Sequence, residues 1–176
     1  MKNNFHQSTK KKIGSIILNN LFEIKGVISA TITGSYSDSN NLEQVNDIDV
    51  VVISQKLDRK IFYKCKNKLK LIKEKIILKK NKKLLINTTF GPLKFDTEKN
   101  LVIHLMIYDI NTHKQHTINS PFTCLDWERS NFFLGKSLKE ISPVFRLQYR
   151  DFFEARRNVN EYIKEISNLN ISYRKY

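Results

Sequence analysis

The stretch that decides the fold reads Thr31-Ile32-Thr33-Gly34-Ser35 and, after eleven further residues, Asp47-Ile48-Asp49-Val50. The β-branched residues 27–33 stop at a glycine and residues 48–53 form an apolar run, so each part predicts a strand, the second a central one. Residues two apart on a strand lie on the same face, which places Asp47 and Asp49 together. Two such carboxylates repel each other unless a cation lies between them, and hard oxygen ligands of this kind suit Mg²⁺ or Mn²⁺.

The pair Gly34-Ser35 at the end of the first strand is typical of a turn that binds a phosphate group. A phosphate chain is bound by a backbone that approaches closely, by exposed N–H groups and by hydroxyls, and this pair supplies all three. The sequence therefore predicts a phosphate-binding turn together with a cation site.

Helices are expected on both sides of this stretch. Ser8-Thr9 precede a periodic apolar segment that ends at Gly26, which is typical of a capped helix. After the aspartates, residues 56–83 predict a lysine-rich helix. Its apolar residues recur at spacings of three and four, which indicates one core-facing side: Phe62, Cys65, Leu69, Ile72 and Ile76.

The second half of the chain predicts a sheet extension followed by helices. Residues 84–90, 93–95 and 101–108 are expected to be strands of an antiparallel extension around the turn at Gly91-Pro92. Residues 125–133 predict a short helix, and Ser142-Pro143 is expected to open a longer one. That last helix would carry Phe145, Leu147, Phe152, Phe153 and Tyr162.

The central motif resembles that of the polymerase-β-type nucleotidyltransferase superfamily, in the form of a small bacterial-type domain protein. Its signature is an apolar residue, Gly, Gly or Ser, a loop of about nine to thirteen residues, then Asp, apolar, Asp or Glu, apolar. The matching residues are Gly34, Ser35, Asp47, Ile48, Asp49 and Val50, and the likeness covers the chain from about Ile13 to Asp109. It implies an α/β (α+β) nucleotidyltransferase fold, with a small mixed sheet flanked by helices. We expect this domain at residues 1–110 and a helical C-terminal extension, residues 111–176, packed on it.

The resemblance also implies an activity: an NTP-dependent enzyme that moves a nucleoside monophosphate to a hydroxyl or phosphate acceptor while pyrophosphate leaves. Asp47 and Asp49 would hold Mg²⁺ or Mn²⁺ for a two-metal in-line transfer. The Gly34 backbone and Ser35 would bind the terminal phosphates. Tyr36 is expected beside the base or sugar. Lys94, in the hairpin where related sequences carry a basic residue, is expected to reach a phosphate.

The main departure from the family pattern concerns a third carboxylate on a later strand, where this chain has His104. A neutral imidazole is a poor Mg²⁺ ligand, but it can take a proton from an attacking hydroxyl. His104 is therefore a candidate catalytic residue, and a core histidine is the alternative. Other candidates for the missing acid are Asp96, Glu98 and Asp109, although Asp109 falls on the opposite face of a regular strand.

Two rival functions follow from the same residues. Without a third acid, the chain would be a catalytically impaired nucleotide-binding or regulatory module. Alternatively, the acceptor is RNA, which the net charge of +14 favours. Residues 56–83 hold twelve Lys and Arg59 against Asp58 and Glu74. Lysine is the poorer residue for forked phosphate recognition and codon bias also produces it, so a solvated helix face is the favoured interpretation.

The remaining expectations concern surroundings and partners. Two Cys, no apolar segment of spanning length and no signal-type start favour a cytoplasmic protein without a membrane partner. The substrates would be an NTP and an acceptor that is a small molecule, a protein or RNA. The segment after Asp109 is short, so a second copy or a partner protein is expected to complete the acceptor site. His113 and His116 are expected at the surface, and Lys136 either at a phosphate or exposed.

Overall fold

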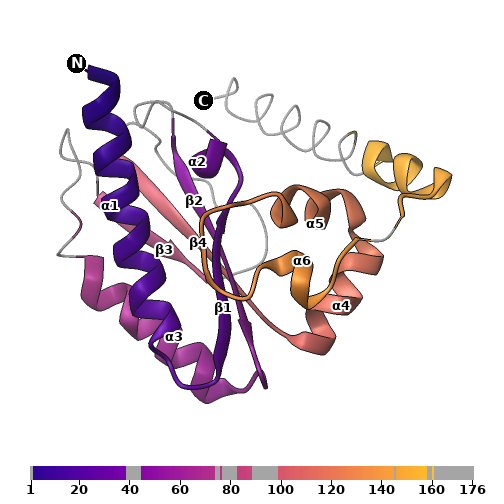
Figure 1. The fold of residues 1–176 in the computed structure, drawn as a ribbon, viewed down its shortest axis with the longest axis horizontal. Coiled ribbons are helices and arrows are strands. Elements are labelled where there is room, and N and C mark those ends of the chain that lie inside the picture. The colour runs from indigo at the N-terminus through magenta and orange to yellow at the C-terminus, as the bar shows by residue number, and fades with distance from the viewer. Residues whose placement is uncertain are drawn as a thin grey trace, which may run out of the picture.

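The structure, a computed structural model, describes residues 2–38, 45–73, 76, 83–88, 99–144, 146–157 and 160. A mixed five-stranded sheet of order β3-β4-β2-β1-β5 forms its centre (Figure 1). Strand β1 is antiparallel to β2 and β5, whereas β4 is parallel to β2 and β3. The strand bounds are β1 Val27–Thr33, β2 Asp47–Ser54, β3 Lys83–Asn87, β4 Asn100–Asp109 and β5 Phe133–Gly135.

Helices cover both faces of the sheet. One layer holds α1 and α3, the other holds α4, α5 and α6, and the single turn α2 follows directly on β1 (Figure 1). The helix bounds are α1 Lys2–Phe22, α2 Ser35–Asp38, α3 Arg59–Lys73, α4 Ile110–Asn119, α5 Pro121–Glu128 and α6 Leu138–Ile141. None of the helices in the described ranges is both long and apolar enough to cross a bilayer.

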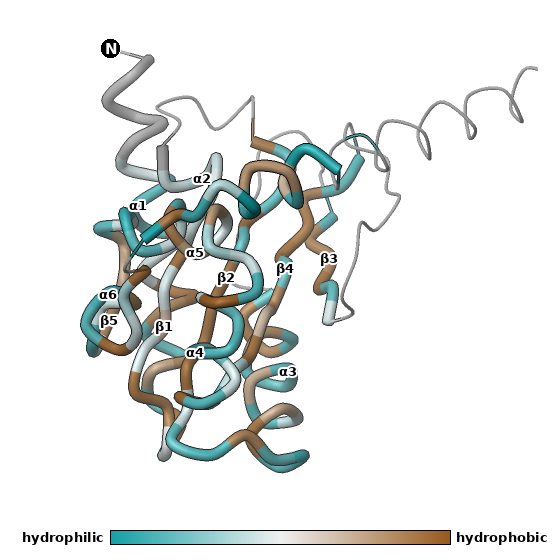
Figure 2. Tube along the Cα trace, turned by 90° about the vertical axis from the view of Figure 1, so that its right-hand side faces the viewer, coloured by the Kyte–Doolittle hydropathy of each residue, from teal (hydrophilic) through white to brown (hydrophobic). Residues whose placement is uncertain are grey.

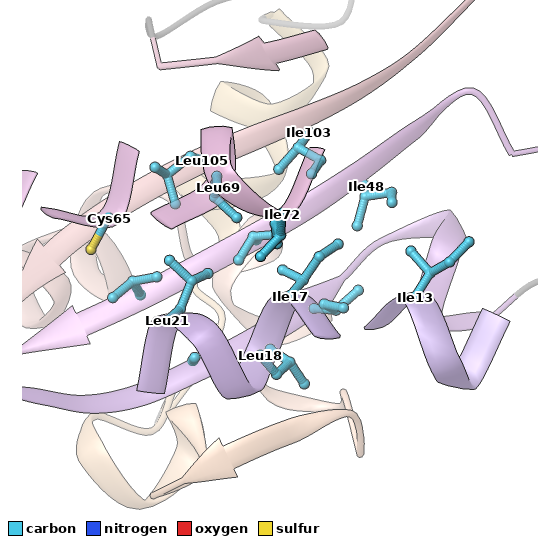
Figure 3. Packing of buried hydrophobic residues seen from close by; sticks show 14 of the residues in the cluster. Ile13, Ile17, Leu18, Leu21, Ile48, Cys65, Leu69, Ile72, Ile103 and Leu105 are labelled. Atoms are coloured by element: carbon cyan, nitrogen blue, oxygen red, sulfur yellow. The ribbon is translucent and has the colours of Figure 1, made fainter. Parts of the chain in front are cut away.

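The alternation of β2 separates two hydrophobic cores. Ile48, Val50 and Val52 belong to the larger core with α1 and α3, part of which Figure 3 shows. Val51 and Ile53 belong to a smaller core with α5 and α6. Because side chains alternate along a strand, Asp47 and Asp49 lie on the face of the smaller core.

The first half of the chain follows the sequence-based predictions closely. Strands β1 and β2 lie where they are expected, and Cys65, Leu69 and Ile72 of α3 are buried. The helix expected over residues 56–83 is shorter than predicted, since α3 ends at Lys73 and Lys83 begins β3. The start of α1 differs, because the helix begins at Lys2 and Ser8-Thr9 lie inside it. Figure 2 shows the alternating hydropathy along α3 that produces its buried side.

The predicted antiparallel extension is wrong for β3 and β4, which pair in parallel. A parallel pair needs a crossover of about a dozen residues, and residues 88–99 between the two strands are long enough. The expected short strand at residues 93–95 and the turn at Gly91-Pro92 lie outside the described residues.

Helices follow β4, as expected, but their bounds differ from the prediction. Helix α4 begins directly after β4, with a capping box in which Asp109 and Thr112 satisfy each other's backbone N–H groups. Helix α5 starts earlier than predicted, with Pro121 in its first turn, and Phe133 belongs to strand β5. Residues 142–144 and 146–148 are not helical, and the last described helix begins at residue 149.

Candidate active site

A row of polar residues crosses four strands at one end of the sheet. Thr33 of β1 pairs with Asp49 of β2, Asp49 pairs with His104 of β4, and His104 pairs with Asn87 of β3. Residues opposite each other on neighbouring strands share a face, so these four side chains lie side by side. Asp47, two residues before Asp49, lies on the same face and approaches His104. The two aspartates therefore lie together, as the sequence predicts.

The turn after β1 brings the backbone against one of these carboxylates. Gly34 has a φ of +67°, which a residue with a side chain rarely adopts. A Cβ at this position would lie 2.7 Å from Asp49 Oδ2. The positive φ favours glycine at this position, and a Cβ would in addition force the Asp49 carboxylate to move. Ser35 follows as the first, exposed residue of α2.

The electrostatics of Asp49 favour a cation. Burial and, second, the charge of Asp47 raise the pKa of Asp49 to about 6, while His104 acts in the opposite direction. The charge of Asp126, on α5, raises this pKa further. A carboxylate in such surroundings is unfavourable in its charged form unless a cation offsets the repulsion.

The donor set fits Mg²⁺ or Mn²⁺ together with a phosphate-bearing substrate. Among the described residues no group of three or more His, Cys, Asp or Glu side chains could hold a metal ion by itself. Mg²⁺ is commonly bound through one or two carboxylates plus substrate phosphates and water, a requirement that Asp47 and Asp49 meet.

His104 faces the carboxylates. Its Nε2 lies 3.9 Å from Asp47 Oδ2, and its Nδ1 accepts a hydrogen bond of 3.0 Å from Asn87 Nδ2. A neutral ring whose Nδ1 accepts carries its proton on Nε2, which here is directed at Asp47. His104 is thus a hydrogen-bonded sheet residue whose Nε2 lies on the side of the carboxylates, and its catalytic role stays a prediction. Sequence reasoning missed Asn87, because nothing in an apolar strand end distinguishes an amide that orients a histidine.

The expected place of Tyr36 beside a nucleotide base or sugar is wrong. Its side chain is buried in the larger core, where its hydroxyl donates a 2.8 Å hydrogen bond to the Lys10 carbonyl. Burial raises the pKa of Tyr36 well above its usual range. The Lys10 ammonium in turn donates to the Ser37 carbonyl at 2.8 Å, so α1 and α2 are held together from both sides. Tyr36 is a structural residue of the turn.

Further predicted residues lie elsewhere. Lys94, Asp96 and Glu98 are outside the described residues. Asp109 pairs with Ser54 at the far end of β2 and caps α4, where its Oδ1 accepts from the Thr112 N–H at 2.8 Å. The Lys136 amide donates to the Ile28 carbonyl, near the start of β1, whereas Gly34 follows the end of that strand. Neither Asp109 nor Lys136 therefore contributes to the row.

The surface placement expected for His113 and His116 is also wrong. His113 is 1% exposed, and the His116 ring stacks on Tyr108 with centroids 5.2 Å apart and contacts Trp127. Burial lowers the pKa of both imidazoles. They belong to the aromatic packing between α4, α5 and β4, which polar spacing in the sequence does not reveal.

Sequence reasoning also missed a group of residues beyond the sheet. A pocket at the turn after β1 is lined by Gly34, Ser37, Asp126, Arg129 and Ser130. The last three come from α5 and the residues that follow it, and no spacing in the sequence connects them to the motif.

The comparisons agree with the central part of the site. The model of a nucleotidyltransferase domain family matches residues 15–111. This range contains the Gly34 turn, both aspartates and His104, and it ends before α5. No curated protein and no solved structure matches the chain.

Proposed function

The chain belongs to the nucleotidyltransferase domain family, and we propose that it transfers a nucleoside monophosphate from an NTP to a hydroxyl or phosphate acceptor. The observation that carries this proposal is the contact geometry of Asp49. Its carboxylate shares a face with Asp47 and packs against the side-chain-free backbone of Gly34. Cation ligands and a phosphate-binding turn are thereby joined, which is what phosphoryl and nucleotidyl transfer require.

In the proposed reaction an acceptor oxygen forms a bond to the α-phosphorus, and the bond from the α-phosphorus to the bridging oxygen breaks to release pyrophosphate. Asp47 and Asp49 would hold Mg²⁺ or Mn²⁺. Such ions, two in the proposed mechanism, would neutralise the phosphate charge and would lower the pKa of the attacking hydroxyl. The Gly34 backbone and the exposed Ser35 hydroxyl bind the terminal phosphates, so that the α-phosphate lies over the aspartates.

We propose that His104 accepts the proton of the attacking hydroxyl group. Nε2 can accept that proton only when Nδ1 carries the ring proton. Asn87 permits this form by turning its amide, so that Oδ1 accepts from Nδ1–H in place of the present bond from Nδ2. Asn87 is then a positioning residue that holds the His104 ring through Nδ1 in either tautomer.

A second candidate function is a nucleotide-binding or regulatory module without turnover. It is favoured by one observation: at the register position beside Asp49 the described chain has His104 in place of an acid. An RNA acceptor has less support, because the lysine side of α3 lies in the layer opposite the carboxylates. The other acceptors, small molecules or proteins, stay part of the proposal, as do a partner or second copy at the acceptor site and a cytoplasmic location.

The test is metal-dependent pyrophosphate release. The protein is incubated with Mg²⁺ or Mn²⁺, each labelled NTP in turn, and panels of small hydroxyl compounds, proteins and RNA. We expect release with one acceptor class and a loss of at least about a hundredfold in Asp49→Asn. Tight NTP binding without release across all panels would establish the regulatory module instead. An RNA acceptor additionally demands an affinity that falls steeply with salt.

A further inference from the structure

The pocket lined by Gly34, Ser37, Asp126, Arg129 and Ser130 joins two parts of the chain with different origins. Gly34 and Ser37 belong to the turn inside the family-matched range, residues 15–111. Of the other three residues, Asp126 belongs to α5 and Arg129 and Ser130 follow it, all beyond that range. This pocket therefore combines the family's phosphate turn with residues that the family match does not include.

Hydrogen bonds through Ser130 fasten the end of α5 to the turn. The Ser130 hydroxyl donates to the Ile32 carbonyl at 2.5 Å and accepts from the Phe132 N–H at 3.1 Å. The Ile32 N–H in turn donates to the Phe132 carbonyl at 2.9 Å. Ser130 Oγ also lies 3.4 Å from Ser37 Oγ, across the pocket. Because Ser130 is held from β1 and from α2, its neighbour Arg129 is positioned at the turn.

Arg129 is the only cation that lines this pocket in the described chain. It caps the C-terminus of α5, with its backbone N–H directed at the carbonyls of Asp126 and Trp127, and its side chain is exposed at the rim of the pocket. Within the described ranges, none of the ion pairs that lie within 4 Å involves its guanidinium. A guanidinium offers a planar fork of donors that matches two phosphate oxygens, so this position suits a phosphate group.

Asp126 lines the same pocket and makes it selective. A free polyphosphate would be repelled by this carboxylate and by Asp47 and Asp49 nearby. A polyphosphate with a bound divalent cation carries both positive and negative charge. The cation offsets the charge of the carboxylates, while the Arg129 guanidinium binds the phosphate oxygens.

From this arrangement we propose that Arg129, held by Ser130, binds the terminal phosphates of a metal-bound triphosphate in this pocket. The proposal deepens the proposed function and rests on it for the identity of the substrate. The segment after residue 111 then supplies part of the nucleotide site, in addition to covering the sheet.

Binding of inorganic triphosphate, measured by calorimetry with and without Mg²⁺, tests the pocket directly. We expect Mg²⁺-triphosphate to bind, and Arg129→Ala to weaken it about tenfold to a hundredfold, since hydrogen bonds to charged groups contribute about 1.5–3 kcal/mol. Arg129→Lys should recover part of the affinity. Arg59→Ala, on α3 in the opposite layer, is the matched control and should bind as the wild type does. Asp126→Asn should improve binding of the metal-free triphosphate.

The outcomes separate this inference from the proposed function. If Arg129→Ala melts at the temperature of the Arg59→Ala control yet binds Mg²⁺-triphosphate equally well, the inference is overturned, and it is also overturned if the wild type does not bind Mg²⁺-triphosphate. If binding depends on Arg129 but no acceptor yields pyrophosphate, the pocket assignment stands and the transfer reaction fails. Where transfer is measured, Arg129→Ala should raise KM for the NTP by the same factor with little change in kcat.

Discussion

At the scale of single residues, Asp49 combines the properties that a cation site needs with a cost to the folded state. Its pKa is raised to about 6 by burial and by Asp47. A carboxyl with a folded-state pKa above its unfolded value is penalised when charged, so its contribution destabilises the metal-free protein above pH 6 and disappears as the pH falls below the unfolded value. The charged Asp49 side chain therefore lowers the stability of the metal-free folded protein, which is typical of a residue in a functional site.

Replacing Asp49 by Asn should raise the melting temperature of the metal-free protein at pH 7. The amide removes the repulsion, and we expect a gain on the order of 1 kcal/mol, or about 2–4 °C. The gain should shrink as the pH falls from 6 towards 4 and vanish near pH 3, where the wild-type carboxyl is protonated in both states. Thermal melts in a chelator between pH 3 and pH 8 measure this, with the exposed Glu154→Gln as control. An Asp49→Asn protein that is less stable than the wild type at pH 7 would contradict the argument.

Gly34→Ala should abolish metal-dependent nucleotide binding at a modest cost in stability. The left-handed φ costs about 1–2 kcal/mol with a Cβ, and that Cβ would displace the Asp49 carboxylate. Gly26→Ala is a matched control, because Gly26 also has a positive φ but its Cβ would only touch Ile61 at 3.6 Å. The two variants should lose similar melting temperature, and only Gly34→Ala should lose binding by calorimetry. Equal binding in both would show that the contact with Asp49 is immaterial.

How well a site residue could be predicted depended on how far along the chain its partners lie. Asp47, Asp49 and Gly34 are linked by strand alternation and one turn, which the sequence displays. Arg129 reaches the same turn only because Ser130 bonds to β1, and no local pattern encodes that contact. The prediction for Tyr36 was wrong although its partners are local. Tyr36 is the residue next to Ser35 in the short helix α2, and at this position its ring points into the core.

At the scale of elements, α3 decides what the net charge of the chain does. Its buried side belongs to the larger core with α1, while Asp47 and Asp49 lie on the opposite face of the sheet. The lysines of α3 are thus separated from the carboxylates by the sheet. Exposed charges beyond a Debye length of about 8 Å are largely screened at physiological salt.

Changing three exposed lysines of α3, Lys60, Lys64 and Lys70, to Gln should leave NTP binding within about threefold of the wild type at 0.15 M salt, because their field is screened. Direct binding measurements at several salt concentrations test this, with Arg129→Ala as the variant that does weaken binding. A large loss with a steep salt dependence would mean that the α3 side guides the nucleotide after all.

The elements also differ in how well their sequences predict them. Strands β1 and β2 and the buried side of α3 have regular apolar patterns, and these predictions are confirmed. Helix α4 has no apolar pattern, since it is built on a capping box and buries His113 and Thr117. The relative direction of β3 and β4 was predicted wrongly, because an apolar run does not show whether a strand pairs in parallel or antiparallel with its neighbour. The length of the connection between the two strands is the feature that distinguishes these cases.

At the scale of the whole molecule, the sheet is completed from both ends of the chain. Strand β5 pairs with β1, and α5 and α6 cover the face that carries Val51, Ile53 and Tyr108. The segment after residue 110 therefore closes one of the two cores, and we infer that the sequence-based boundary at this position does not divide independent folding units.

A chain that ends at residue 110 should fail to fold cooperatively. It would expose the apolar side chains of the smaller core and leave β1 as an unpaired edge beside the phosphate turn, two changes that a small domain does not tolerate. A broad or absent thermal transition and binding of a hydrophobic dye are the expected readouts. A chain that ends at residue 160 retains α4, α5, β5 and α6 and serves as the control, with a cooperative melt near that of the full chain. A cooperative melt of the shorter chain within a few degrees of the full one would instead make residues 1–110 an autonomous domain.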